Sequence, residues 1–407
     1  MANIYNKAGL VAIPAPYKDG FLYNIRPDDD ILAFRFDRGS SATFVNKEGF
    51  VDTSVSTQNT PRIDYTDSLT SPALLLEPSS SNIITRSETF NTWNVNGNAS
   101  TSLVQQLNPS GQSGCLLLSG ATDINWGGSN NAFQRGVDNI NINSSYTFSV
   151  FVKSLGSTTF TTTLRNNNTG TLDRTVHDID GNWKRVSVTA STNSTQSLIG
   201  IVLGGTNGDV LLWGAQLEEQ SFATSYIPTT SSTITRLAET CVGAGSTSTI
   251  NSTEGVLYAE IAALANSGTF REISLNDGAT NNAIEIRYNN NNNQIQFIVR
   301  DGGSVQVNET YSSVNVLDFN KAAISYKAND FKIFVNGTKV FTDTSGTIPS
   351  GLNELSFNWG GTNPFHGKTK GVYVFNEALS DDELQQLTGP EYNTFAALAA
   401  ASNYTIQ

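Results

Sequence analysis

The stretch that decides the fold runs from Val210 to Glu218, VLLWGAQLE, and is followed by Ala223 to Thr229, ATSYIPT. The first part begins as an apolar strand and ends in an amide and a carboxylate, and the second part closes with a proline. Upstream, the segment Tyr146–Val152 alternates with period two, which places Tyr146, Phe148, Val150 and Val152 on one face and Phe151 on the other. Together these segments predict an all-β domain.

The composition of the whole chain agrees with an all-β fold. Only 15% of the 407 residues are charged, and there are 34 glycines. Long helices need Ala, Leu, Glu, Lys and Arg in quantity, whereas short strands with tight turns use β-branched residues, Gly, Asn and Ser. Domain-size statistics favour two or three units for a chain of this length.

The charge and hydropathy of the chain argue against two classes of partner, nucleic acids and the membrane interior. The formal net charge is -12, from 36 acidic and 24 basic residues, and no run of Lys or Arg forms a basic stripe. Nucleic-acid binders gain affinity by neutralising phosphates, so we expect no nucleic-acid partner and favour a neutral glycan or another protein. No apolar run approaches the roughly 20 residues that cross a bilayer, so we expect no membrane insertion.

The N-terminal apolar run Gly9–Ile13 is followed by Pro14 and Pro16 and does not form a signal-peptide core. We therefore expect a soluble protein made in a cytoplasm. Cys115 and Cys241 are the only cysteines and lack the spacing of a zinc or redox site. Because free cysteine is often buried, we expect two buried thiols, with a disulfide as the alternative.

The first part of the chain, residues 1–78, has too few apolar residues to close a core of its own and is predicted to be an arm or clasp. Short blocks follow one another here and just beyond residue 78: an Asn-x-x-Gly turn ending at Gly49, Pro61-Arg62-Ile63-Asp64-Tyr65, Leu74-Leu75-Leu76-Glu77-Pro78, Asn82-Ile83-Ile84 and Ser87-Glu88-x-Phe90. Their order resembles the leader that precedes the jelly roll in fibre and virion-surface proteins of tailed bacteriophages. This resemblance implies that residues 1–78 attach the protein to the virion.

Residues 79–242 show the strand density of a sandwich. The segment Trp183–Val188 follows a hairpin signal at Asp180-Gly181, and Ser197–Leu203 and Asp209–Leu217 supply two more strands. With Tyr146–Val152 they resemble a jelly roll of the carbohydrate-binding-module type. Residues 243–253 are polar and are predicted to be a linker.

Residues 254–390 form a second predicted β unit. Asn336-Gly337 is a type I′ hairpin signal, and Ser380 with Glu383 is a capping box for a closing helix in which Leu384 and Leu387 face inward. The order of strands and closing helix resembles a concanavalin A-like, laminin-G-type sandwich. The fold class is therefore all-β, with two tandem β-sandwiches after an extended N-terminal arm, and a tail at 391–407 that docks elsewhere.

The concanavalin-like fold also occurs in glycosidases, so the sequence could in principle carry the catalytic residues of glycoside hydrolysis. That reaction uses two carboxylates across the scissile bond, which on one strand requires acids at alternate positions. No predicted strand carries such a pair: Glu285 sits alone between apolar neighbours, and Glu260 has no acid two residues later. We expect no enzymatic activity and no catalytic residue.

Glycan binding requires exposed aromatic rings, with amides to bind hydroxyl groups. Trp126 beside Asn125, and Trp359 with Asn363 and His366 nearby, lie among glycines and amides and are the candidate glycan-binding residues. Buried packing is the alternative for both tryptophans. Trp93, Trp183 and Trp213 are expected to be packing residues, and His177 a surface or turn residue.

No metal-binding residue or cofactor is predicted, although both fold types often hold a structural calcium ion. Asp123, Asp209, Asp277 and Asp301 lie near predicted turns. No Asp-x-Asp-x-Asp loop accompanies them. A structural calcium ion therefore stays an open alternative.

The resemblances imply a structural protein on the surface of a tailed-phage virion: a fibre, a tail appendage or a capsid decoration. Its implied partners are other virion proteins of the capsid, portal or tail, and a host cell-surface glycan. Such proteins assemble as homo-oligomers, with a trimer favoured. Two alternatives differ in class: a lectin whose main role is glycan recognition, and a polysaccharide depolymerase.

Overall fold

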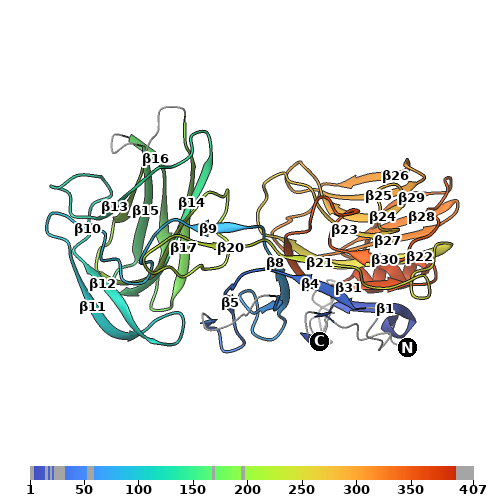
Figure 1. Cartoon of the computed structure of the whole chain (residues 1–407), viewed down its shortest axis with the longest axis horizontal. Helices are drawn as coiled ribbons and strands as arrows, with labels where there is room; N and C mark the ends of the chain where they lie inside the picture. The colour runs from blue at the N-terminus through green and yellow to red at the C-terminus, as the bar shows by residue number, and fades with distance from the viewer. Residues whose placement is uncertain are drawn as a thin grey trace, which may run out of the picture. The chain divides into compact units, whose positions relative to one another are not determined.

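The computed structural model describes residues 4–13, 17–18, 21–22, 33–52, 59–166, 170–193 and 198–390. Within these ranges the chain is almost wholly β, and the expectation of two β-sandwiches is confirmed (Figure 1). The chain divides into two compact units. The first sandwich unit comprises Arg38–Pro72 and Glu77–Glu239, and the second comprises Met1–Asp37, Ala73–Leu76 and Thr240–Gln407. This division splits the predicted arm between the two units.

The first unit contains two antiparallel five-stranded sheets within its described residues. One sheet has the order β10 (Asn94–Val95), β13 (Phe133–Asp138), β18 (Leu198–Gly204), β15 (Thr159–Asn166), β16 (Gly170–Asp178). The other has the order β11 (Ser100–Leu107), β12 (Ser113–Ser119), β19 (Asp209–Glu218), β14 (Ser145–Leu155), β17 (Lys184–Ser191). Strands β9 (Ser80–Asn82) and β20 (Ile234–Arg236) pair with each other in a separate, two-stranded antiparallel sheet.

Every second side chain along β14 points into the core of this sandwich, as predicted. Tyr146, Phe148, Val150 and Val152 are buried in one apolar cluster with residues of both sheets. Phe151 lies on the opposite face, in a second cluster around Trp213. Trp93 belongs to the main core and Trp183 packs against the second cluster, so the prediction that these three tryptophans are packing residues is confirmed.

A bulge in β19 explains the glycine in the stretch that decided the fold. The register between β14 and β19 shifts beside Gly214, whose φ is 66°. A Cβ at Gly214 would lie 3.2 Å from the rings of Phe151 and Tyr226. Glycine both permits the left-handed backbone and leaves room for the rings. Past the bulge, Gln216 accepts a hydrogen bond from Ile227 N at 2.6 Å and so holds the exit segment on the sheet.

The described residues of segment 38–72 (38–52 and 59–72) pack on the outer face of the β14–β19 sheet. It contains β5 (Phe44–Val45), β6 (Val51–Asp52) and β7 (Arg62–Asp64). Val51 is buried beside Trp213 and Tyr226, and Val45 packs against the same cluster. This part of the predicted arm therefore completes the first sandwich unit.

A buried ionic network fixes this segment. Glu239 accepts Arg38 Nη1 at 2.6 Å and Arg62 Nη2 at 2.5 Å, and Glu77 accepts Arg62 Nη1 at 2.7 Å and Arg236 Nη1 at 2.5 Å. All five side chains are at most 3% exposed. Burial alone would raise the pKa of Glu77, but the charges of Arg236 and Arg62 outweigh it and lower that pKa. The network joins chain segments more than 150 residues apart.

The second unit contains two main sheets. One has the order β29 (Thr338–Asp343), β28 (Asp330–Val335), β27 (Asn320–Lys327), β22 (Glu254–Ala263), β31 (Gly367–Phe375), β8 (Ala73–Leu76), with β1 (Ala8–Ile13) also on β31. The other has the order β26 (Ser304–Tyr311), β25 (Ile295–Asp301), β24 (Ala283–Tyr288), β23 (Arg271–Asn276), β30 (Glu354–Ser356). Short strands β2 (Tyr17–Lys18), β3 (Phe21–Leu22), β4 (Phe34–Asp37) and β21 (Thr240–Val242) form a third sheet, and η1 (Ile4–Lys7) precedes β1.

The local signals of this unit are confirmed. Asn336 and Gly337 have φ values of 49° and 82°, as the predicted turn between β28 and β29 requires. Helix α1 (Asp381–Thr388) begins at the Ser380 N-cap, buries Leu384 and Leu387, and packs against β27, β28 and β29. Cys115 and Cys241 are both buried and are not joined in a disulfide, as expected. The tail at 391–407 lies outside the described residues.

Replacing Ser380 by alanine is expected to destabilise the second sandwich by about 1 kcal/mol. Ser380 Oγ accepts the Glu383 N–H, and the Glu383 carboxylate accepts the Ser380 N–H at 2.9 Å, so both bonds of the capping box depend on this pair. Urea unfolding measures the effect. Ser345→Ala in an exposed turn is the control, and equal stability of the two variants would contradict the expectation.

Candidate functional site

One face of the β23–β26 sheet in the second unit is polar and charged. In β24, Ile284, Ile286 and Tyr288 alternate into the core, so Glu285 and Arg287 share the opposite face. The cross-strand register places Glu272 opposite Arg287 on one side and Gln296 opposite it on the other. We call the following residues the polar face: Glu272, Glu285, Arg287, Gln296 and Arg300.

The two carboxylates of the polar face are close to each other and share an arginine. Arg287 Nη1 lies 2.7 Å from Glu272 Oε1 and 3.7 Å from Glu285 Oε2. Arg300 Nε donates to Glu285 Oε1 at 2.9 Å. Both glutamates are fully buried, whereas the arginine side chains are 10% and 18% exposed. Glu285 has no second acid on its own strand, as the sequence indicated, but Glu272 on the adjacent strand lies near it.

The protonation of this pair reflects its burial. Burial raises the pKa of Glu285 to about 7, and the charge of Glu272 adds to the rise against the opposing effect of Arg300 and Arg287. Burial also raises the pKa of Glu272. The Oε2 atoms of both glutamates have no hydrogen-bond partner among the described residues.

Two aromatic rings flank the arginines at the surface. The Arg300 guanidinium lies 4.7 Å from the ring centroid of Trp359, and that of Arg287 lies 4.5 Å from the ring centroid of Phe270. Trp359 is half-buried, and its Nε1 donates to Thr280 O at 3.1 Å. The ring is therefore held in one orientation with part of its surface exposed.

The loop after β30 contributes two of the predicted site residues to this face. Trp359 begins a tight turn closed by mutual backbone hydrogen bonds with Thr362 at 2.9 Å. Asn363 Nδ2 then donates to Glu272 Oε1 at 3.2 Å, and Asn363 O accepts the Glu272 N–H. The structure thus brings Trp359 and Asn363 to the polar face. His366 lies further along, half-buried, next to the start of β31.

The other predicted pair belongs to the first unit. Trp126 is half-buried in the loop between β12 and β13, and its carbonyl accepts Asn130 Nδ2 at 2.8 Å. Asn125 is exposed, and its carbonyl accepts Gln134 Nε2 at 3.0 Å. These two residues therefore lie on a different unit from Trp359. His177 was expected to be a surface or turn residue; it is half-buried within strand β16, contacts Thr162 Oγ1 at 2.9 Å, and is not in a turn.

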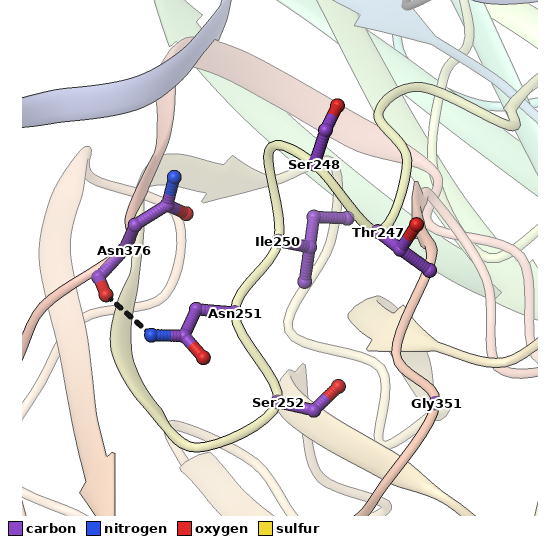
Figure 2. Close-up of a pocket in the computed structure, with 7 residues that line it drawn as sticks. All are labelled: Thr247, Ser248, Ile250, Asn251, Ser252, Gly351 and Asn376. Atoms are coloured by element: carbon purple, nitrogen blue, oxygen red, sulfur yellow. Dashed lines mark hydrogen bonds between the residues drawn. The ribbon is translucent and has the colours of Figure 1, made fainter.

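A separate hollow of about 520 Å³ lies in the second unit (Figure 2). It is lined by Thr247, Ser248, Ile250, Asn251, Ser252, Gly351 and Asn376. The wall is held by Asn251 Nδ2, which donates to Asn376 O at 2.8 Å, and by Ser252 Oγ, which accepts Leu352 N–H at 2.9 Å. Residues of the predicted linker 243–253 thus fold onto the second sandwich. None of the residues that line the hollow is charged or aromatic. The polar face is therefore the stronger candidate for a ligand-binding site.

The aspartates considered for calcium take part in local hydrogen bonds. Asp277 Oδ2 accepts Asn282 Nδ2 at 2.8 Å, and Asp301 Oδ2 accepts Thr347 Oγ1 at 2.5 Å. Within the described ranges no three His, Cys, Asp or Glu side chains gather as a metal site would require. The same ranges contain no helix with the length and apolar character of a membrane span.

Sequence reasoning missed Glu272, Arg287, Arg300 and Phe270. A signal for the first was present: Glu272, Ser274 and Asn276 alternate with Ile273 and Leu275, which is typical of a strand with one polar face. The arginines stood at alternate positions with apolar residues in the same way. Only the register of the sheet shows that these side chains meet.

Comparison with known proteins supports the type of the second sandwich. Residues 248–385 match the family model of the concanavalin A-like lectin/glucanases superfamily. The second sandwich is therefore concanavalin A-like. No curated protein matches the chain.

Several solved structures resemble parts of the chain. The CBM40 module of the Ruminococcus gnavus IT-sialidase is 18% identical, covers 36% of this chain and 94% of its own, and gives a TM-score of 0.31. Domain 4 of AbnA, an extracellular arabinanase from Geobacillus stearothermophilus solved with arabinotriose, is 12% identical and covers 42% and 84%, with a TM-score of 0.30. The active domain of tailspike protein 4 of bacteriophage CBA120 is 10% identical and covers 33% and 21%, with a TM-score of 0.26. Scores this low describe a resemblance and say nothing of ligands.

Proposed function

We propose that this protein is a structural component of a tailed-phage virion that binds a host-surface glycan through the polar face of its second sandwich. The observation that carries the glycan proposal is the fixed, partly exposed Trp359 ring beside Arg300, with Asn363 next to it. An aromatic ring offers a face to the C–H groups of a sugar, and amide and guanidinium groups bind its hydroxyls. The match of residues 248–385 to a lectin-type family supports it.

The virion part of the proposal is supported by the leader blocks. Arg62 and Glu77, from two of these blocks, meet in the buried network of the first sandwich with Arg236 and Glu239. The blocks thus have a common folding role in this chain, which is the role expected of a leader joined to a jelly roll. Other virion proteins would be partners, and the virion surface the location. We propose a homo-oligomer, with a trimer favoured, and light scattering of the full chain tests it.

We propose that the protein has no hydrolytic activity. Both close carboxylate pairs described above, Glu272 with Glu285 and Glu77 with Glu239, are buried and paired with arginines. A general acid or nucleophile must reach the glycosidic bond. Incubation with host polysaccharide tests the depolymerase alternative, since shortened chains would establish it.

Replacing Trp359 by alanine is expected to weaken glycan binding at the polar face roughly tenfold or more, because about 1.4 kcal/mol of ring contact corresponds to one decade of affinity. Binding of the full chain to a glycan array, followed by calorimetry on the best ligand, measures this. Trp183→Ala, at a tryptophan of the first unit, is the control and should bind at this site as the wild type does. A folded wild-type chain that binds no glycan would contradict the glycan-binding role and would leave the proposed virion role unaffected.

A further inference from the structure

Two sequence motifs that the polar face does not involve meet at one cavity in the first unit. The motifs are Ser87-Glu88-x-Phe90 and Tyr226-Ile227-Pro228-Thr229, and the cavity has a volume of about 550 Å³. This lies within the range of small-ligand pockets. Its polar lining includes Arg86, Glu88, Thr89, Thr229, Thr230 and Ser231.

The wall of this cavity is fixed by hydrogen bonds between the two motifs. Ser87 Oγ and Tyr226 Oη lie 2.6 Å apart, and Thr229 N donates to Ser87 Oγ at 3.0 Å. Thr229 Oγ1 donates to Ile84 O at 2.5 Å. The cavity is therefore built before any ligand arrives, which lowers the entropic cost of binding.

The backbone of Arg86 is fixed on this wall, whereas its charged side chain has no partner among the described residues. Its backbone is left-handed, with φ of 58°, and its N–H donates to Thr230 O at 2.6 Å while its carbonyl accepts the Phe90 N–H at 3.2 Å. A non-glycine residue in this conformation is uncommon. The guanidinium is exposed and makes no ion pair or hydrogen bond with any residue that the structure describes.

Glu88 provides an acceptor on the same wall. It is half-buried, and its Oε1 accepts the Tyr226 hydroxyl at 3.2 Å. Burial raises the pKa of Glu88 despite this bond. Its Oε2 has no hydrogen bond with the described residues, so it can accept from a ligand.

The remaining surface of the cavity is apolar. Pro228 is half-buried and Ile234 is 39% exposed, and both line the cavity. A hexose presents C–H groups on one face and hydroxyls around its edge. The apolar surface can contact the C–H groups. The Glu88 carboxylate can accept hydrogen bonds from hydroxyl groups, and the Arg86 guanidinium can donate hydrogen bonds to hydroxyl or ring oxygens.

We infer that this cavity is a second saccharide site, on the first sandwich, and that it takes a neutral hexose or a glycan with a neutral hexose end. The pair Arg86 and Glu88 has no net charge, and Glu88 repels a ligand carboxylate placed beside it. The inference rests on the proposed glycan-binding role and adds a second location to it.

The test uses the full chain with methyl α-glucoside, methyl α-galactoside and methyl α-mannoside, and with the best ligand from the array. Glu88→Gln and Arg86→Asn are the variants, since asparagine tolerates the left-handed backbone. Each is expected to weaken binding at this cavity at least tenfold and to leave the melting temperature unchanged. The wild type should bind two ligands per chain, and Trp359→Ala one.

The outcomes separate this inference from the proposed function. If Trp359→Ala removes all binding, the cavity is not a saccharide site and the polar face still is. If Trp359→Ala changes nothing and Arg86→Asn removes all binding, the cavity stands and the polar-face site is wrong. Tighter binding of sialylated or uronate-containing glycans at the cavity overturns the neutral ligand class. Absence of any saccharide binding overturns both.

Discussion

Glu239→Gln is expected to destabilise the first sandwich by about 3–5 kcal/mol, the usual effect of removing one partner from a buried ion pair. The carboxylate accepts from Arg38 and Arg62, neither of which is exposed, and from Glu77 N at 2.9 Å. Neutralising it leaves two guanidinium groups buried without sufficient negative charge. Urea unfolding followed by tryptophan fluorescence measures the loss, since four of the five tryptophans lie in this unit.

Two further variants make this result specific. Glu254→Gln removes a half-exposed pair with Lys327 at 3.1 Å in the second unit and should cost about 0–1 kcal/mol. Arg62→Met combined with Glu239→Gln should cost less than the sum of the single changes, because the two residues interact directly. A loss below 1 kcal/mol for Glu239→Gln, or strict additivity in the double variant, would show that the network does not fix the leader.

The pH dependence of the first sandwich follows from the same network. The pKa of Glu77 is lower in the folded than in the unfolded chain, so the unfolded state binds more protons in acid. Glu77 therefore stabilises the fold above its unfolded pKa of about 4.5. This contribution is lost as the pH falls further.

The features that the sequence predicted correctly are local ones. The face of Phe148 and Val150, the Asn336-Gly337 turn and the Ser380 capping box each depend on residues within a few positions of one another. Period two, turn propensity and capping operate at that range. Such signals were sufficient to predict two β-sandwiches and a closing helix.

The features that escaped prediction depend on strand register. Period two along β24 shows that Glu285 and Arg287 share a face, but only the pairing of β24 with β23 brings Glu272 beside them. A search for two acids on one strand could not find a pair on two strands. Likewise, Arg62 and Glu77 were singled out as parts of an ordered leader, but nothing local connects them to Glu239, more than 150 residues later.

The same limit explains which residues near the polar face were singled out from the sequence. Trp359 and Asn363 were chosen from their local surroundings of glycines and amides, and the structure places both at the polar face. The arginines beside them were not chosen, because arginine among apolar strand residues does not by itself indicate a partner. Their carboxylate partners come from register, and their aromatic neighbours come from loops.

The stability of the second sandwich is expected to fall by about 3 kcal/mol as the pH rises from 4.5 to about 7, because of Glu285. Burial, with the charge of Glu272, raises the pKa of Glu285 to about 7, so the folded chain keeps a proton that the unfolded chain has released. Between these pH values the folded state binds more protons than the unfolded state, and stability decreases with pH. A pKa raised from 4.5 to about 7 corresponds to roughly 3 kcal/mol, at about 1.4 kcal/mol for each tenfold change in acidity.

Glu285→Gln should remove the part of this dependence that comes from Glu285 and leave only the part from Glu272, because glutamine keeps the shape and the acceptor for Arg300 Nε without a titrating proton. The variant should match the wild type near pH 5 and exceed it in stability at pH 8. Amide exchange of peptides from β24 in urea, corrected for the intrinsic exchange rate at each pH, localises the effect to this sheet. Glu254→Gln in the same unit should leave the wild-type profile unchanged. A flat wild-type profile would contradict the expectation and would mean that both buried glutamates are ionised in the folded chain.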